Sequence, residues 1–173
     1  MSPYETTSVA VPGGTVVVIV DPDDGAVVAS GFGDLDYTFA FLTAAEQRRG
    51  HVEVAPDAPS VQPAVAALTA YADGDVDALD KVHVRQPGGP FLLRAWDVMR
   101  EVHAGETDTY AGLAVRAGSP SAVRAAGQAC ARNKVAPFVP CHRILRTGGS
   151  LGGYAYGLPV KEALLVHEGA LLA

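Results

Sequence analysis

The sequence predicts an α/β N-terminal domain, with a small antiparallel sheet and helices, followed by a mostly α C-terminal domain that contains a helix-turn-helix. β-branched runs suited to paired strands lie in the first half, and apolar residues at helical spacing lie in the second. The segment QPGGP at 86–90 interrupts any regular element between them. We therefore expect two domains, at 1–87 and 88–173.

Charge divides the chain at the same place. Residues 1–89 hold 4 basic and 13 acidic side chains, whereas residues 90–173 hold 9 basic and 6 acidic ones. The overall net charge of −6 argues against a protein held on nucleic acid by bulk charge. The second half is nevertheless basic, and this pattern fits either scattered solvated charge or a local basic face. Its basic side chains between 116 and 146 are Arg116, Arg124, Arg132, Lys134, Arg143 and Arg146.

The N-terminal sequence indicates the compartment. No basic leader precedes the run VVVIV at 16–20, which is far too short to span a bilayer. We expect no membrane association and a cytoplasmic protein, associated with the nucleoid if its source is bacterial or archaeal. In a reducing cytosol the two cysteines, Cys130 and Cys141, are either buried small hydrophobic residues or catalytic, although pairing is also conceivable from the sequence.

The first half contains the expected hairpin. The runs TVVVIV at 15–20 and AVVASGF at 26–32 flank DPDDG, whose Asp-Gly step suits a turn between strands. Helical composition follows at 37–49 and 60–72, where Pro63 marks the start of the second helix. A short strand is expected at Lys81–Arg85.

The second half contains three expected helices in succession. Leu92, Ala95, Trp96 and Met99 give 91–102 one buried helical face. A second helix covers 109–117 and stops at Gly118. Ser119 as N-cap and Pro120 in the first position then begin the third helix, completing a helix-turn-helix.

The third helix is slim, because alanine and glycine fill most of the segment PSAVRAAGQACARN at 120–133. Such a helix either packs tightly against another helix or lies close against a DNA groove, with Arg124 projecting into the duplex. The second alternative suits a protein that searches for damage rather than for a sequence.

The segment PFVPCHRIL places Cys141 next to His142 and two residues from Arg143. A neighbouring base or positive charge favours the thiolate, which is the nucleophilic form of cysteine. Glu168 could orient an imidazole from its far side. A direct Cys–His hydrogen bond would require a turn or a bridging water.

Several motifs together resemble the O6-alkylguanine-DNA alkyltransferases over about residues 90–170. PCHR at 140–143 follows Asn133 by the expected spacing and precedes the other motifs in order. These further motifs are FLLRAWDVM at 91–99, GET at 105–107, TYAGLA at 109–114, GSPSAVRAAG at 118–127, GGYAYGL at 152–158 and LLVHEG at 164–169.

The resemblance implies a DNA repair protein that moves an alkyl group from O6-alkylguanine onto its own Cys141, once per molecule, after flipping the base. It implies that His142, acting through a water and held by Glu168, takes up the thiol proton. Tyr110 would bind DNA beside the phosphate of the flipped nucleotide and would assist proton delivery to the departing guanine. Arg124 would fill the gap left in the base stack.

The remaining roles also come from the resemblance. Asn133 and Arg143 would support the active site, and further DNA contacts would come from Ser119, Ala122 and Ala125. The pocket would be lined by Ile144, Tyr154, Ala155 and Tyr156.

The sequence departs from the family pattern at Ala155 and Tyr156, where Gly or Ser is usual. A hydroxyl contact to the alkylated oxygen is then missing, and the Tyr156 ring either points to solvent or covers the pocket. His51 and His83 without a cysteine before position 130 make a poor zinc site, so we expect no metal and no cofactor. We expect a monomer whose partner is double-stranded DNA containing O6-alkylguanine.

Two other functions compete with this one. An alkyltransferase-like protein would recognise alkylated DNA without transfer, but such proteins lack the cysteine that this chain has at position 141. A thiol hydrolase would need an oxyanion hole, for which no motif is present.

Overall fold

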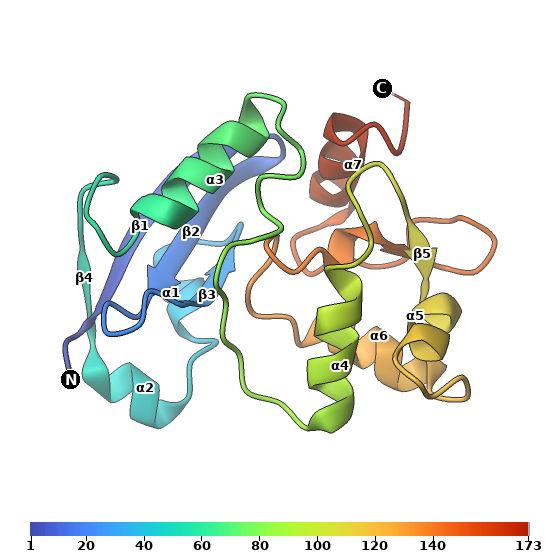
Figure 1. The fold of residues 1–173 in the computed structure, drawn as a ribbon, viewed down its shortest axis with the longest axis horizontal. Coiled ribbons are helices and arrows are strands. Elements are labelled where there is room, and N and C mark those ends of the chain that lie inside the picture. The colour runs from blue at the N-terminus through green and yellow to red at the C-terminus, as the bar shows by residue number, and fades with distance from the viewer. Residues whose placement is uncertain (173) are drawn as a thin grey trace. The chain divides into compact units, whose positions relative to one another are not determined.

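The computed structural model describes residues 1–172 and divides the chain into two compact units. The first unit comprises Met1–Gln86 together with Lys134–Phe138, and the second comprises Pro87–Asn133 and the chain from Val139 onward. None of the helices within residues 1–172 has the length and apolar character needed to cross a bilayer. Figure 1 shows the two units as a sheet with helices and a group of helices.

The segment Lys134–Phe138 belongs to the first unit, whereas the predicted division assigned it to the C-terminal domain. The backbone N–H of Ser30 donates to the carbonyl of Lys134 at 2.8 Å, and the Ser30 hydroxyl donates to the carbonyl of Ala136 at 2.8 Å. These bonds attach the segment to the edge of the first unit's sheet. Backbone pairing between segments so distant in sequence leaves no side-chain pattern that would predict it.

The first unit contains a four-stranded sheet in the order β3-β2-β1-β4. The hairpin between β2 and β3 is antiparallel, which confirms the prediction. The predicted antiparallel sheet is in fact mixed, because β4 pairs with β1 in parallel; neither β1 nor β4 was predicted. The strands are β1 (Tyr4–Val11), β2 (Gly14–Val20), β3 (Val27–Gly31) and β4 (His51–Glu53).

Both faces of this sheet are covered. Side chains alternate between the faces of a strand, and the five consecutive residues Val16–Val20 are all buried. Val17 and Ile19 pack in one cluster with Leu35 and Phe39 of α1 (Leu35–Phe39). The longer helix α3 (Gln62–Ala72) contacts β1 and lies along the sheet in Figure 1.

The segment predicted as one helix at 37–49 is interrupted, so this prediction is wrong. It consists of α1 and a separate helix α2 (Ala44–Arg49), because Thr43 begins a new helix with a capping box. Glu46 N donates to Thr43 Oγ1 at 3.2 Å, and Thr43 N donates to Glu46 Oε2 at 2.7 Å. Leu42, just before this cap, is buried in the core cluster.

The other predicted elements of this half have mixed outcomes. The helix at 60–72 is present as α3, with Pro63 in its first turn. The strand expected at Lys81–Arg85 is reduced to a single bridge between Val84 and Val27.

The second unit is mostly helical, as predicted. The side chain of Trp96 donates from Nε1 to the carbonyl of Ala129 at 2.9 Å, which joins the first and third helices of the unit. A two-stranded parallel sheet completes it. The elements are α4 (Pro90–Met99), β5 (Asp108–Thr109), α5 (Tyr110–Arg116), α6 (Val123–Ala131), β6 (Ile144–Leu145) and α7 (Leu158–His167).

The turn between α5 and α6 differs from the prediction in one respect. Gly118 has a φ of +84°, and Ser119 N donates to the carbonyl of Ala114 at 2.9 Å, so α5 ends in a Schellman motif. Ser119 is not the N-cap of α6. It opens a turn with Pro120 in the second position, closed by Ala122 N donating to the Ser119 carbonyl at 2.9 Å, and α6 starts after that turn.

Candidate active site

Cys141 opens a short 3₁₀ turn, η1 (Cys141–Arg143), and its side chain is buried, with 7% of the residue exposed. Asn133, two residues after the end of α6, donates from Nδ2 to the carbonyl of Val139 at 2.8 Å and to Cys141 Sγ at 3.3 Å. One amide therefore holds both the turn that presents the cysteine and the sulfur atom itself.

His142, Arg143 and Glu168 form a fully buried group behind this turn. His142 Nε2 lies 2.8 Å from Glu168 Oε2. Arg143 donates from Nε to Glu168 Oε1 at 2.8 Å and from Nη2 to Oε2 at 3.1 Å. Its Nη1 donates to the carbonyl of Val102 at 2.7 Å. Paired and hydrogen-bonded in this way, the buried charges of Arg143 and Glu168 compensate one another.

The protonation states of this group follow from its environment. Burial opposes the charge on Glu168, but hydrogen bonds from His142 and Arg143 outweigh it and hold the pKa of Glu168 at about 2. Burial lowers the pKa of His142, assisted by the charge of Arg143, despite the partner carboxylate. A neutral His142 beside an ionised Glu168 must carry its proton on Nε2, which leaves the lone pair on Nδ1.

His142 Nδ1 is therefore the basic atom of the site. It is buried and has no hydrogen-bond partner within residues 1–172. No hydrogen bond joins it directly to Cys141 in the described part of the chain. An imidazole oriented by a carboxylate, with its basic nitrogen unengaged, is the arrangement of a general base.

Lys161 is a site residue that was absent from the sequence prediction. It is 0% exposed, and its ammonium donates to the carbonyls of Ile144 at 2.7 Å, Leu151 at 2.5 Å and Gly153 at 3.2 Å. A signal for its burial was present in the sequence: Lys161 precedes Leu164 and Leu165 by three and four residues, and so shares their apolar face of α7.

Lys161 also supplies the positive charge near the thiol. Burial raises the pKa of Cys141, while the hydrogen bond from Asn133 and the charge of Lys161 act against that rise. Arg143, the nearer cation in the sequence, instead donates to Glu168 and to the carbonyl of Val102.

Tyr110, the first residue of α5, lies against the turn that follows β6. A Cβ at Gly152 would stand 3.0 Å from the Tyr110 hydroxyl, and Gly152 has a φ of +73°, so this close approach depends on glycine. Burial raises the pKa of Tyr110. The phenol therefore keeps its proton at neutral pH.

The rings of Tyr154 and Tyr156 pack edge to face, with centroids 5.6 Å apart and an interplanar angle of 66°. The Tyr156 hydroxyl oxygen is buried, whereas Ala155 between the two is exposed. The Tyr156 ring is thus packed against protein rather than turned to solvent. Ile144, also predicted to line the pocket, is fully buried, and its carbonyl accepts from Lys161.

The predicted DNA contacts lie on the turn before α6 and on α6 itself. Arg124 is exposed, while Ser119, Ala122 and Ala125 are half-buried. A Cβ at Gly127 would meet no atom within 4 Å, so the helix surface is open there. No interaction within residues 1–172 joins these positions to the thiol of Cys141. Cys130 is half-buried on α6, and burial raises its pKa.

Metal binding finds no support in the described residues. No group of three or more His, Cys, Asp or Glu side chains within residues 1–172 is placed to hold a metal ion.

The geometry defines a class of protein with a buried cysteine next to a carboxylate-oriented histidine, in a unit with a helix-turn-helix layout. Residues 90–170 match the family model described as "6-O-methylguanine DNA methyltransferase, DNA binding domain". Residues 90–170 are thus similar to the DNA-binding domain of this family.

Curated relatives agree with this match. A methylated-DNA–protein-cysteine methyltransferase of Methanosarcina acetivorans is 43% identical over 103 residues, covering 60% of this chain and 65% of the relative. The protein of the same name from Salmonella typhimurium is 39% identical over 105 residues, covering 61% of each. The chain thus spans somewhat less than two thirds of the length of these relatives.

Solved structures extend the likeness over both units. The crystal structure of Mycobacterium tuberculosis O6-methylguanine methyltransferase has a TM-score of 0.74 and 27% identity, covering 98% of this chain and 94% of that one. A structure of the M. tuberculosis protein in complex with DNA has a TM-score of 0.74 and 28% identity, covering 96% and 92%.

Proposed function

We propose that this protein repairs DNA by transferring an alkyl group, typically methyl, from O6 of guanine irreversibly to its own Cys141. The observation that carries the proposal is the buried chain of contacts from Asn133 to Cys141 and from His142 to Glu168. The names of the relatives supply the substrate class, and the geometry fits the chemistry that those names require.

In the reaction, the Cys141 sulfur bonds to the alkyl carbon as the carbon–O6 bond breaks. The thiol proton passes to Nδ1 of His142, through a water because no direct bond joins the two residues. The imidazolium that forms is stabilised by the ionised Glu168. Arg143 keeps this carboxylate ionised and fixed in place, and therefore acts as a positioning residue.

The departing guanine needs a proton to leave as a neutral base. Tyr110 is the donor that we propose, because its raised pKa keeps the phenol protonated until the transfer. Lys161 and Asn133 favour the thiolate against the effect of burial. The product is a thioether, which water does not cleave under mild conditions, so each molecule reacts once.

Access to O6 requires the base to leave the duplex, at a cost of a few kcal/mol that is smaller for a poorly paired alkylated guanine. We assign duplex binding to α5 and α6, with Arg124 occupying the gap in the stack. The exposed Arg124 and the open surface at Gly127 support a close approach of α6 to the groove.

The test is the loss of O6-methylguanine from a synthetic duplex, followed by chromatography of the digested DNA. The expected result is the loss of at most one methylated base per protein molecule, abolished in Cys141→Ser and retained in Cys130→Ser. Repeated turnover would indicate a hydrolase. Duplex binding without any loss would indicate a recognition protein, and either outcome rejects the proposal.

A further inference from the structure

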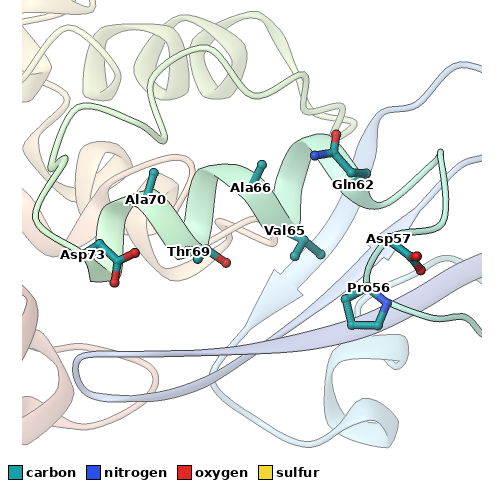
Figure 2. A pocket seen from close by; sticks show the side chains of 8 residues that line it. All are labelled: Pro56, Asp57, Gln62, Val65, Ala66, Thr69, Ala70 and Asp73. Carbon is teal, nitrogen blue, oxygen red and sulfur yellow. The ribbon is translucent and has the colours of Figure 1, made fainter.

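Basic side chains concentrate in the segment 109–161, which holds 7 of them and no acidic side chain. The first unit has the opposite character where its surface is hollowed. Figure 2 shows this groove along α3, with Asp57 beside the start of the helix and Asp73 at its end. A nucleic acid is repelled by carboxylates and attracted by a segment with cations alone. The segment 109–161 is therefore the part of the chain suited to an anionic substrate.

Arg146 stands apart among these cations. It is exposed, and within residues 1–172 no carboxylate forms an ion pair with it. The side chain is therefore available for a role outside the fold itself. Several of the other cations are already engaged: Arg143 with Glu168, Lys161 with three carbonyls, and Arg116 with Asp108.

The backbone at Arg146 forms a tight hairpin of fixed shape. Arg146 N donates to the carbonyl of Ser150 at 3.0 Å, and Gly149 N donates to the carbonyl of Arg146 at 3.0 Å. Gly148 and Gly149 have φ values of +97° and +90°, which residues with a Cβ rarely adopt. The turn thus holds its conformation through two hydrogen bonds and two glycines.

Lys161 fixes the base of this hairpin. Its buried ammonium donates to the carbonyl of Ile144, before the turn, and to the carbonyl of Leu151, after it. One group therefore holds both arms, and the backbone that carries Arg146 lies on a firm support.

The side chain of Arg146 lies beside Tyr110 at Gly152. A Cβ at Gly152 would stand 3.0 Å from the Tyr110 hydroxyl oxygen and 3.3 Å from Arg146 Cγ. The hydroxyl oxygen and Cγ are therefore no farther apart than the sum of these two distances. The guanidinium at the end of the side chain is within reach of the phenol.

Arg146 is the charged neighbour of this phenol. Burial raises the pKa of Tyr110, whereas the charge of Arg146 and a hydrogen bond from the backbone of Gly153 lower it. The other titratable groups near the phenol are the thiols of Cys130 and Cys141. Burial raises the pKa of each thiol, so both are uncharged at neutral pH and do not compete with the guanidinium.

We propose that Arg146 is a positioning residue for the proton donor, and that its guanidinium stabilises the phenolate that Tyr110 becomes on giving its proton to the departing guanine. The inference rests on the proposed function, in which Tyr110 is that donor. In this step the Tyr110 O–H bond breaks, and the proton bonds to the guanine, which keeps the electron pair of the broken carbon–O6 bond. The negative charge left on the phenol oxygen faces Arg146. A bound nucleotide excludes water, which strengthens the attraction between these two charges.

Arg146→Met tests the proposal, because it removes the charge and keeps an unbranched side chain. The pKa of Tyr110 should rise, since a phenolate without a nearby cation is less stable, and single-turnover transfer should slow about tenfold. The slowing should be equal for a duplex containing O6-methylguanine and for free O6-benzylguanine, because the step does not involve the DNA backbone. Arg146→Lys restores the charge and should recover most of the rate.

The titration of Tyr110 is measured by NMR of the labelled ring carbon that bears the hydroxyl, and its signal is assigned by its loss in Tyr110→Phe. Arg48→Met makes the matched change on the exposed surface of α2 and should alter neither the transfer rate nor this titration. In the Tyr110→Phe background, Arg146→Met should cause no further slowing, because the two side chains act in one step.

Four results would overturn the inference. Slowing on the duplex alone means that Arg146 binds the DNA backbone. Additive effects of Arg146→Met and Tyr110→Phe mean that Arg146 does not act through the phenol. An unchanged rate and titration in Arg146→Met means that the charge has no role, and a slow Arg146→Lys means that shape matters rather than charge. The proposed function is rejected by a different result, a wild-type protein without any transfer, and in that case the titration of Tyr110 still tests the pairing.

Discussion

Replacing Lys161 by methionine tests the residue that the sequence least suggests. The substitution keeps an unbranched side chain of similar length and removes only the ammonium. Three carbonyls that now accept from Nζ, of Ile144, Leu151 and Gly153, would lose this donor.

The expected loss of stability follows from opposing terms. A buried carbonyl left without a donor costs about 1–3 kcal/mol, and removing the ammonium relieves several kcal/mol of desolvation. The net destabilisation should be about 2–4 kcal/mol, which lowers the melting temperature by roughly 5–15 °C in a chain of this size. Calorimetry of the folded variant measures it.

The chemical effect is separate from the loss of stability. Without the charge of Lys161, burial raises the pKa of Cys141 further, and each unit of that rise corresponds to about a tenfold loss of thiolate. Single-turnover transfer should slow at least tenfold at a temperature where the variant is folded, with duplex affinity retained. The pH dependence of Cys141 alkylation by iodoacetamide reports the thiol pKa directly.

Lys81→Met is the matched control, since Lys81 is exposed in the first unit. It should change neither the transfer rate nor the thiol pKa. If folded Lys161→Met transfers at the wild-type rate with an unchanged thiol pKa, Lys161 supports only the loop and the electrostatic role assigned to it is incorrect.

Three further predictions follow from the site. Gly127→Ala should raise the free energy of unfolding by about 0.5–1 kcal/mol, because alanine favours the helix and its Cβ meets no atom within 4 Å. The same Cβ should weaken duplex binding about tenfold. Unchanged affinity for the duplex would show that α6 does not lie against it. Because the pKa of His142 is lowered, its imidazole should stay neutral as the pH falls through about 6.5, the ordinary pKa of histidine. Transfer at about pH 6 should therefore match that at about pH 7.5, and a half-loss of transfer near pH 6.5 would contradict the assignment. The same lowered pKa makes stability fall below pH 6.5, because the unfolded chain takes up the proton there and the folded chain does not. Tyr156→Gly should accelerate benzyl transfer relative to methyl by about ten- to hundredfold if the packed ring covers the pocket, and an unchanged ratio of the two rates would exclude that role.

The elements that the sequence predicted correctly depend on local pattern. The β2–β3 hairpin follows from β-branched runs around an Asp-Gly turn, and α4 follows from the spacing of Ala95, Trp96 and Met99. The contact between His142 and Glu168 was expected from motif order and a resemblance, since no local rule brings residues so distant in sequence together.

The elements that were missed depend on tertiary context. Strand β1 contains the buried Thr6 and Thr7, so its polar composition hides its place in the sheet. The break between α1 and α2 depends on Thr43, whose capping bond competes with helix continuation. Ser119 was predicted as an N-cap. The following Pro120 fits the second position of a turn equally well, and the structure has the turn.

The central claim is that Cys141 is the alkyl acceptor, and intact mass measurement with peptide mapping tests it most directly. After incubation with a duplex containing O6-methylguanine, the protein should gain the mass of one methylene group, located on the peptide that holds Cys141. Cys141→Ser should gain nothing while still binding the duplex. A mass gain on Cys130, or a gain that persists in Cys141→Ser, would contradict the account.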